Sequence, residues 1–271
     1  MILECILWLL SILTNGMITM FSGIYNKWYM ILIMVLLLPF VYILYVALYF
    51  FLVVVISPLI PTKKELTKPK PFSYFFVKQT FKLIMDLARI KVIMTGKENL
   101  PDGKCLYIAN HRSNFDPFPL CYYFKGNIAC VSKEENFSKA IFSNYIKRCC
   151  YVPMPKDDQL EQVKSINKAA NLIKQDTSSI LIFPEGTRNK TDDVLIPFKP
   201  GSFKIAKKAK CPLVVVSVKG TTSIKKNWPL KRTKVYVDIL KVFTPEEVST
   251  LSTVDLSNEA YNLIESNYMV K

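Results

Sequence analysis

Two long apolar runs open the chain and shorter alternating patterns follow them. From Trp28 to Ile60 no residue is charged, and this run exceeds the roughly 20 apolar residues that a helix needs to cross a bilayer. An earlier segment, about Cys5 to Phe21, begins apolar but contains the polar stretch 14–16, which fits a second span, a re-entrant arm or an interfacial helix. We expect the two runs to form a helical hairpin that turns near Ser22 to Lys27.

The amino end argues against a cleaved signal peptide. It carries Glu4 in place of a basic cluster, and a longer apolar run follows directly. We therefore expect residues 1–62 to stay attached as a membrane-embedded helical segment and residues 63–271 to form a separate domain.

The second part of the chain alternates between two hydrophobic periods. A helix is expected over 71–90, lying against the membrane or the core. Short β-rich runs occur at about 91–95, 104–109, 128–132, 179–184, 212–218 and 234–240, and helical stretches lie near 117–124, 137–147, 158–175 and 200–209. Strands interleaved with helices predict an α/β fold with a mainly parallel sheet flanked by helices.

Charge is distributed unevenly. Residues 1–60 contain one acid and one base, so the net charge of +15 belongs to the rest of the chain. Lys63, Lys64, Lys68 and Lys70 follow the second apolar run, where the positive-inside rule predicts the cytoplasmic side of a cell membrane. These lysines either contact anionic headgroups or form a solvated linker. No helix-turn-helix, zinc-finger or RNA-binding pattern accompanies the charge, so we do not expect nucleic acid as a partner.

Cysteine and histidine usage limits the chemistry. The chain has seven cysteines, an odd number without a Cys-x-x-Cys pair, which favours reduced thiols in a cytosolic compartment. Because the chain also contains a single histidine, a zinc site is not expected.

That histidine is His111, and Asp116 follows it five positions later. Imidazole is the side chain whose unperturbed pKa lies closest to neutrality, and a neighbouring carboxylate fixes its tautomer and orientation. The pair is therefore a candidate general base for an alcohol or a thiol. In contrast, Ser113 lacks the Gly-x-Ser-x-Gly elbow of a hydrolase nucleophile.

A second motif ends another β-rich run, in the stretch Phe183-Pro184-Glu185-Gly186-Thr187-Arg188. Gly186 allows the backbone to approach a ligand closely, and Arg188 brings a planar set of donors suited to phosphate. Taken alone, the same residues also fit a β-turn with an exposed arginine. Because ligands bind where parallel strands end, both motifs lie at expected site positions.

The two motifs together, about 70 residues apart behind a membrane segment, resemble the glycerolipid acyltransferases, most closely the bacterial-type 1-acyl-glycerol-3-phosphate acyltransferases. The resemblance runs from about Lys91 to Lys241. His111 and Asp116 match the His-x4-Asp box of that family, and residues 183–188 match its Phe-Pro-Glu-Gly-Thr-Arg box. Val131–Glu135 is similar to its second block, and residues 198–203 with 211–216 are similar to its last block.

The resemblance implies an acyltransferase catalytic domain over residues 63–271 that needs no metal and no cofactor. It would move a fatty acyl group from a thioester, on acyl carrier protein or coenzyme A, to the free hydroxyl of lysophosphatidate, giving phosphatidate for phospholipid synthesis. His111 would be the base and Asp116 its orienting partner. The residues implied to bind substrate are Lys133, Glu185, Gly186, Thr187, Arg188 and Lys156, the last standing where the family usually has arginine.

Two other functions remain open from the residues. An acyltransferase for a different lysolipid would use the same groups. A non-catalytic, membrane-anchored lipid-binding protein would explain the apolar segment and the charge, but it has no need for the His-Asp pair.

Overall fold

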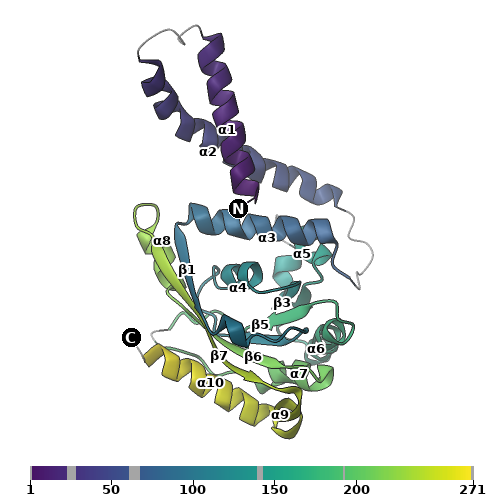
Figure 1. Cartoon of the computed structure of the whole chain (residues 1–271). Helices are drawn as coiled ribbons and strands as arrows, with labels where there is room; N and C mark the ends of the chain where they lie inside the picture. The colour runs from purple at the N-terminus through teal and green to yellow at the C-terminus, as the bar shows by residue number, and fades with distance from the viewer. Residues whose placement is uncertain (1, 23–28, 61–67, 139–142, 192, 270–271) are drawn as a thin grey trace. The chain divides into compact units, whose positions relative to one another are not determined.

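The computed structural model describes residues 2–22, 29–60, 68–138, 143–191 and 193–269 (Figure 1). The chain divides into two compact units, Met1–Pro61 and Thr62–Lys271. Each unit is described separately below.

The first unit consists of α1 (Ile2–Phe21) and α2 (Met30–Ile56), with a short 3₁₀ turn, Ser57–Leu59, after α2. The helices Ile2–Phe21 and Met30–Leu59 are both long and apolar enough to cross a membrane. The turn predicted at 22–27 falls mainly outside the described residues.

Polar groups of α1 lie against α2. Asn15 donates from Nδ2 to the carbonyl of Met34 at 2.8 Å, and the hydroxyls of Thr14 and Tyr45 are 2.7 Å apart. The ring of Trp8 stacks on Tyr42 with centroids 4.1 Å apart. The polar residues that interrupt the first apolar run therefore join the two helices, a common use of polar side chains between apolar helices.

The second unit is built on one seven-stranded sheet with the order β1-β7-β6-β2-β5-β3-β4. All neighbouring strands are parallel except β6 and β7, so the predicted mainly parallel α/β fold is confirmed. The strands are β1 (Ile90–Thr95), β2 (Leu106–Ala109), β3 (Ile128–Lys133), β4 (Val152–Met154), β5 (Ser179–Ile182), β6 (Leu213–Lys219) and β7 (Thr233–Phe243).

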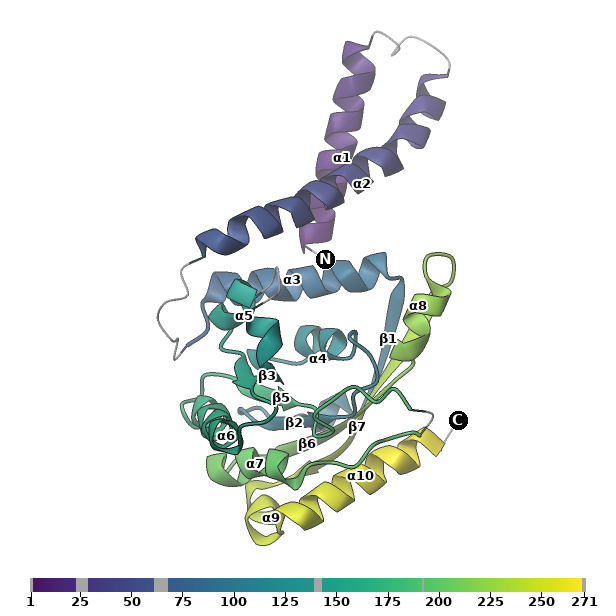
Figure 2. The same cartoon turned by 180° about the vertical axis from the view of Figure 1, so that it is seen from behind.

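Helices cover both faces of this sheet, as Figures 1 and 2 show from opposite sides. One face carries α3 (Pro71–Leu87), α4 (Pro117–Tyr123) and α5 (Ser143–Arg148). The other carries α6 (Gln159–Lys174), α7 (Lys204–Ala209), α9 (Pro245–Thr250) and α10 (Thr253–Met269), and the short α8 (Ile224–Asn227) precedes β7.

Burial follows position in the sheet. The central strands β2 and β5 are buried at every residue, as expected for strands covered by helices on both faces. Strand β7 alternates at its start, where Thr233, Val235 and Val237 are buried and Lys234 and Tyr236 are exposed. The core of the second unit therefore lies around β2, β5 and β6.

The predicted elements differ from the observed ones mainly at their ends. The helix expected over 71–90 ends at Leu87, because Arg89 adopts a φ of 55° that turns the chain into β1. The strand expected over 179–184 ends at Ile182, before the Phe-Pro pair. The helix expected over 137–147 is replaced by a 3₁₀ turn, Glu134–Phe137, and by α5, with 139–142 outside the described residues. Strand β4 was not predicted, because three residues carry too little periodicity.

Candidate active site

The carboxyl ends of four neighbouring parallel strands bring the predicted site segments to one edge of the sheet. His111 follows β2, residues 185–188 follow β5, Lys133 ends β3, and Lys156 follows β4. These strands lie side by side in the order β2-β5-β3-β4. With neighbouring strands about 4.8 Å apart, β4 lies about 14 Å from β2, so Lys156 is the most distant of the four positions by strand.

The imidazole of His111 is fixed on two sides. Its Nδ1 lies 2.9 Å from Oδ2 of Asp116. Its ring stacks on Phe183, with centroids 4.2 Å apart and an interplanar angle of 20°. A carboxylate at Nδ1 favours the tautomer with its proton there, which leaves the lone pair of Nε2 available to accept a proton. The side chain is 19% exposed, so a ligand can reach it.

The carboxylate of Asp116 is fully buried and accepts four hydrogen bonds. Besides His111, its Oδ2 accepts from the backbone N–H of Arg112 at 2.8 Å and of Ser113 at 2.7 Å. Its Oδ1 accepts from the hydroxyl of Thr221 at 2.6 Å. Asp116 precedes α4, but its side chain makes no hydrogen bond that caps that helix. The carboxylate therefore holds the loop of His111 by hydrogen bonds and does not cap α4.

The turn after β5 holds the main chain of His111. Its N–H donates to Oε1 of Glu185 at 2.6 Å, and its carbonyl accepts from the N–H of Asn189 at 2.7 Å. Both residues are buried, at 3% exposure each. The two predicted motifs are therefore joined by hydrogen bonds at both main-chain polar groups of His111, and Glu185 contacts the His111 loop directly.

Burial raises the pKa of Glu185 to about 7, with a smaller contribution from the charge of Asp116, and the N–H of His111 opposes the shift. The other carboxyl oxygen, Oε2, is buried without a hydrogen-bond partner. A carboxyl group in such a place favours its neutral form, so this side chain changes charge near neutral pH.

Gly186 and Lys199 lie against each other beside this turn. Gly186 adopts a φ of 68°, and a Cβ at this position would lie 2.9 Å from Nζ of Lys199. The backbone N–H of Lys199 donates to the carbonyl of Pro184 at 2.9 Å. The glycine therefore leaves room for an ammonium group next to the strand end.

The remaining predicted substrate-binding residues have exposed side chains at strand ends or in the loops that follow them. Thr187 and Arg188 lie in the turn after β5, Lys133 is the last residue of β3, and Lys156 lies beyond β4. With Lys199 they place four cations, Lys133, Lys156, Arg188 and Lys199, at these strand ends, while the exposed acids Glu134, Glu135, Asp157 and Asp158 follow two of them. This edge can attract an anionic group such as a phosphate.

Several residues that hold the site were not predicted from the sequence. They are Phe183, Asn189, Lys199 and Thr221. Phe183 and Lys199 lie inside motifs that were recognised. Thr221 is 105 residues from Asp116, and no local pattern marks such a distant partner.

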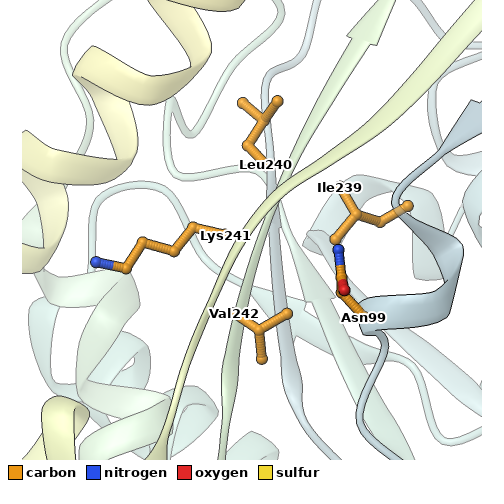
Figure 3. A pocket seen from close by; sticks show the side chains of 5 residues that line it. All are labelled: Asn99, Ile239, Leu240, Lys241 and Val242. Atoms are coloured by element: carbon orange, nitrogen blue, oxygen red, sulfur yellow. The ribbon is translucent and has the colours of Figure 1, made fainter.

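Other parts of the second unit offer less chemistry. A cavity of about 320 Å³ is lined by Asn99 and by Ile239, Leu240, Lys241 and Val242 of β7 (Figure 3). Lys241, the charged residue among them, pairs with Glu259 at 2.7 Å. Among the described residues, no three His, Cys, Asp or Glu side chains gather as ligands for a metal ion.

The chain is similar in sequence to known proteins. The chain is 35% identical over 136 residues to the chloroplastic 1-acyl-sn-glycerol-3-phosphate acyltransferase BAT2 of Brassica napus, covering 49% of this chain and 39% of that protein. It is 29% identical over 163 residues to the 1-acyl-sn-glycerol-3-phosphate acyltransferase of Saccharomyces cerevisiae, covering 59% and 54%. The chain therefore spans about half or less of the length of these curated relatives.

The fold is similar to that of a solved structure, the 1-acyl-sn-glycerophosphate (LPA) acyltransferase PlsC from Thermotoga maritima. The TM-score is 0.60 at 24% identity, and the match covers 73% of this chain and 80% of that one. The family model described as Acyltransferase matches residues 91–219, a range that includes His111, Asp116 and the turn after β5. Residues 91–219 therefore resemble the acyltransferase family in sequence, and the second unit resembles an acyltransferase in fold.

Proposed function

We propose that the protein transfers a fatty acyl group from an activated thioester to the free hydroxyl of 1-acyl-glycerol-3-phosphate, giving phosphatidate. The names of the relatives, which are 1-acyl-sn-glycerol-3-phosphate acyltransferases, support this acceptor. The donor is either acyl-coenzyme A or acyl-acyl carrier protein.

The hydrogen-bonded pair of His111 and Asp116 carries this proposal. Asp116 accepts four hydrogen bonds and orients the ring, and it stabilises the positive charge that the ring gains with a second proton. Nε2 then removes the proton of the acceptor hydroxyl as its oxygen attacks the thioester carbonyl carbon. The carbon–sulfur bond breaks, and the leaving thiolate takes the proton back from the ring. No acyl-enzyme forms, because the substrate hydroxyl is itself the nucleophile.

The basic strand ends supply the phosphate site in this proposal. Arg188 offers two parallel donors to phosphate oxygens, and Lys133 and Lys199 add point charges. Lys156, three strands from β2, contributes less. Glu185 acts on the other side of the turn, where it positions the backbone of His111.

We further propose that α1 and α2 anchor the protein in the cell membrane, with the acyltransferase domain on the cytoplasmic side. The length and hydropathy of the two helices support the anchor. The lysines at 63–70 support the orientation. Since acceptor and product are both lipids, an anchored enzyme meets them at the interface without extracting acyl chains into water.

Acyl transfer by the purified full-length protein in detergent tests the activity. Labelled lysophosphatidate is supplied with acyl-coenzyme A or with acyl-acyl carrier protein, in parallel with the His111→Ala variant and an exposed neighbour, Asn114→Ala. We expect phosphatidate from the wild type and from Asn114→Ala only. A panel of lysolipids without a phosphomonoester tests the acceptor. If another lysolipid is turned over better, that lysolipid replaces lysophosphatidate as the proposed acceptor. If folded protein transfers an acyl group to no acceptor, the acyltransferase proposal is wrong and a lipid-binding function takes its place.

A further inference from the structure

The second unit carries an apolar and basic surface where the end of α3 meets α8 and the loop after it. We call residues 84–88 and 224–232 the α3–α8 surface. Figures 1 and 2 both place α3 and α8 along one side of this unit and α10 along the opposite side.

Large apolar side chains project from this surface. Leu230 is 84% exposed, Trp228 is 57% exposed, and Leu87 is 36% exposed. The indole N–H of Trp228 donates to the carbonyl of Leu87 at 3.0 Å, which ties the loop to the end of α3. Single exposed apolar residues are common, but Trp228 and Leu230 are both exposed, lie two residues apart on a loop that this hydrogen bond ties to α3, and are called the apolar tip below.

Behind this tip lies an apolar cavity of about 340 Å³. Its lining comes from α3, from α8 and its loop, and from the catalytic loop: Ile84, Leu87, Ala88, Phe115, Ile224, Lys225 and Trp228. Phe115 directly precedes Asp116, the partner of His111. The surface therefore continues inward to the wall of the catalytic loop.

Cations flank the apolar tip along the chain. Lys225, Lys226, Lys231 and Arg232 are all exposed, and residues 219–237 contain no aspartate or glutamate. Asp86, the acid in the α3 part of this surface, pairs with Lys82. An apolar tip that bears a tryptophan and is flanked by lysine and arginine matches the surface of an anionic bilayer, where the indole occupies the headgroup level and the cations meet lipid phosphates.

We propose that the α3–α8 surface docks on anionic membrane lipids, as a second membrane contact in addition to α1 and α2. Leu230 and Trp228 enter the headgroup region, and the four cations contact the anionic lipids. The exposed leucine at the tip favours a bilayer over an acidic protein, for which the cations alone would suffice. Docking also turns the mouth of the cavity toward the lipid, and if the proposed function holds, it brings lipid substrates to the loop of His111 and Asp116.

Tryptophan fluorescence tests the proposal without relying on activity. The chain has three tryptophans, so Trp8→Phe and Trp28→Phe leave Trp228 as the single reporter in the full-length protein. This protein is reconstituted into vesicles of phosphatidylcholine with phosphatidylglycerol, whose acyl chains are brominated near the headgroup. We expect Trp228 to be quenched by the brominated lipid and shielded from iodide in the water.

The matched control moves the reporter to the opposite side of the unit. Adding Trp228→Phe and Val254→Trp places the indole on α10, where Val254 is 52% exposed. We expect about threefold weaker quenching by the brominated lipid for this control, because interfacial tryptophans lie within the bilayer only on a docked face. Equal quenching of both reporters would overturn the proposal.

Charge substitution separates docking from mere proximity. Changing Lys225, Lys226, Lys231 and Arg232 to glutamine is expected to reduce the quenching of Trp228 to the level of the control. Each cation near an anionic surface changes the local binding equilibrium about fivefold, so four together dominate it. Quenching that is unaffected by these substitutions would also contradict membrane docking. Shielding of Trp228 from iodide that appears only when acyl carrier protein is added would contradict it too, because the surface would then bind that protein.

Discussion

The loop that carries His111 and Asp116 is fixed from three directions, whereas the cations Lys133, Lys156 and Arg188 are exposed at strand ends. The fixed loop is bound by Glu185 and Asn189 at its backbone and by Thr221 at its carboxylate. This difference fits the two proposed tasks, which are proton transfer by His111 and phosphate binding by the cations. Proton transfer requires a base held within a few tenths of an ångström of its working position, while a phosphate can be bound by side chains that adjust to it.

The comparison predicts that substitutions in the fixed loop lower kcat and that substitutions of the cations raise KM for the acceptor. The largest effect is expected for His111→Ala. Removal of the base should lower kcat about 10³-fold or more, since positioned base catalysis contributes about 10² to 10⁴-fold. Steady-state kinetics with a fixed donor measures it. A kcat within tenfold of the wild type would contradict the role of His111 as the base.

Asp116→Asn is expected to have the next largest effect. The amide keeps the size of the carboxylate but cannot balance a protonated ring, so kcat should fall about 10²-fold or more. Thr221→Val is the matched control, because it removes one of the four hydrogen bonds to Asp116 and leaves its charge. We expect it to lower kcat by about tenfold at most. Equal losses in the two variants would show that orientation, not charge, is what Asp116 contributes.

Arg188→Ala and Lys133→Ala test the exposed cations. Each should raise KM for lysophosphatidate about tenfold and change kcat by less than about threefold, because a charge-assisted bond to phosphate contributes to binding more than to proton transfer. Kinetics with a lysolipid acceptor that lacks phosphate provides the control, and the variants should match the wild type there. A fall in kcat with unchanged KM would indicate that these residues act in the proton transfer, as the fixed loop does, and not in binding the acceptor.

Glu185→Gln examines the fixed region through stability. The pKa of Glu185 is raised to about 7 in the fold from an ordinary value of 4.5. The unfolded chain therefore loses this proton first, and the contribution of Glu185 to stability falls as pH rises from about 4.5 to about 7, by about 1 to 3 kcal/mol.

Chemical unfolding in detergent at several pH values should show this decline in the wild type and a flatter profile in Glu185→Gln. The exposed Glu134→Gln serves as control and should keep the decline of the wild type. The same slope in Glu185→Gln and the wild type would mean that Glu185 ionises as freely in the fold as in the unfolded chain.

Lys156→Ala should give the smallest effect. Its position, three strands away from β2 and about 14 Å by strand spacing, predicts a change in KM for the acceptor of less than about threefold. Lys156→Arg introduces the residue that the family resemblance implies at this position, and it should be neutral or slightly favourable. If Lys156→Ala raises KM as much as Arg188→Ala does, Lys156 belongs to the phosphate site.

Much of the fold was predictable because its signals are local. The alternation of strands and helices from residue 91 onward appears as periodicities within single segments, and it led to the mainly parallel sheet that is observed. The three-residue strand β4 and the helix ends were missed, since neither a short strand nor a left-handed residue such as Arg89 has a periodic signature. The helices α9 and α10 were also missed, because no element was predicted after residue 240.

For the site, the sequence by itself determined the candidate groups: a single histidine with a carboxylate five positions on, and the Glu-Gly-Thr-Arg turn after another strand. Only the tertiary structure decided that β2 and β5 are neighbours, so that Glu185 and Asn189 bind the backbone of His111 while Thr221 binds Asp116. The physical reason is that hydrogen bonds between residues some 70 to 110 positions apart depend on strand order, which the packing of the whole sheet sets and no local pattern encodes.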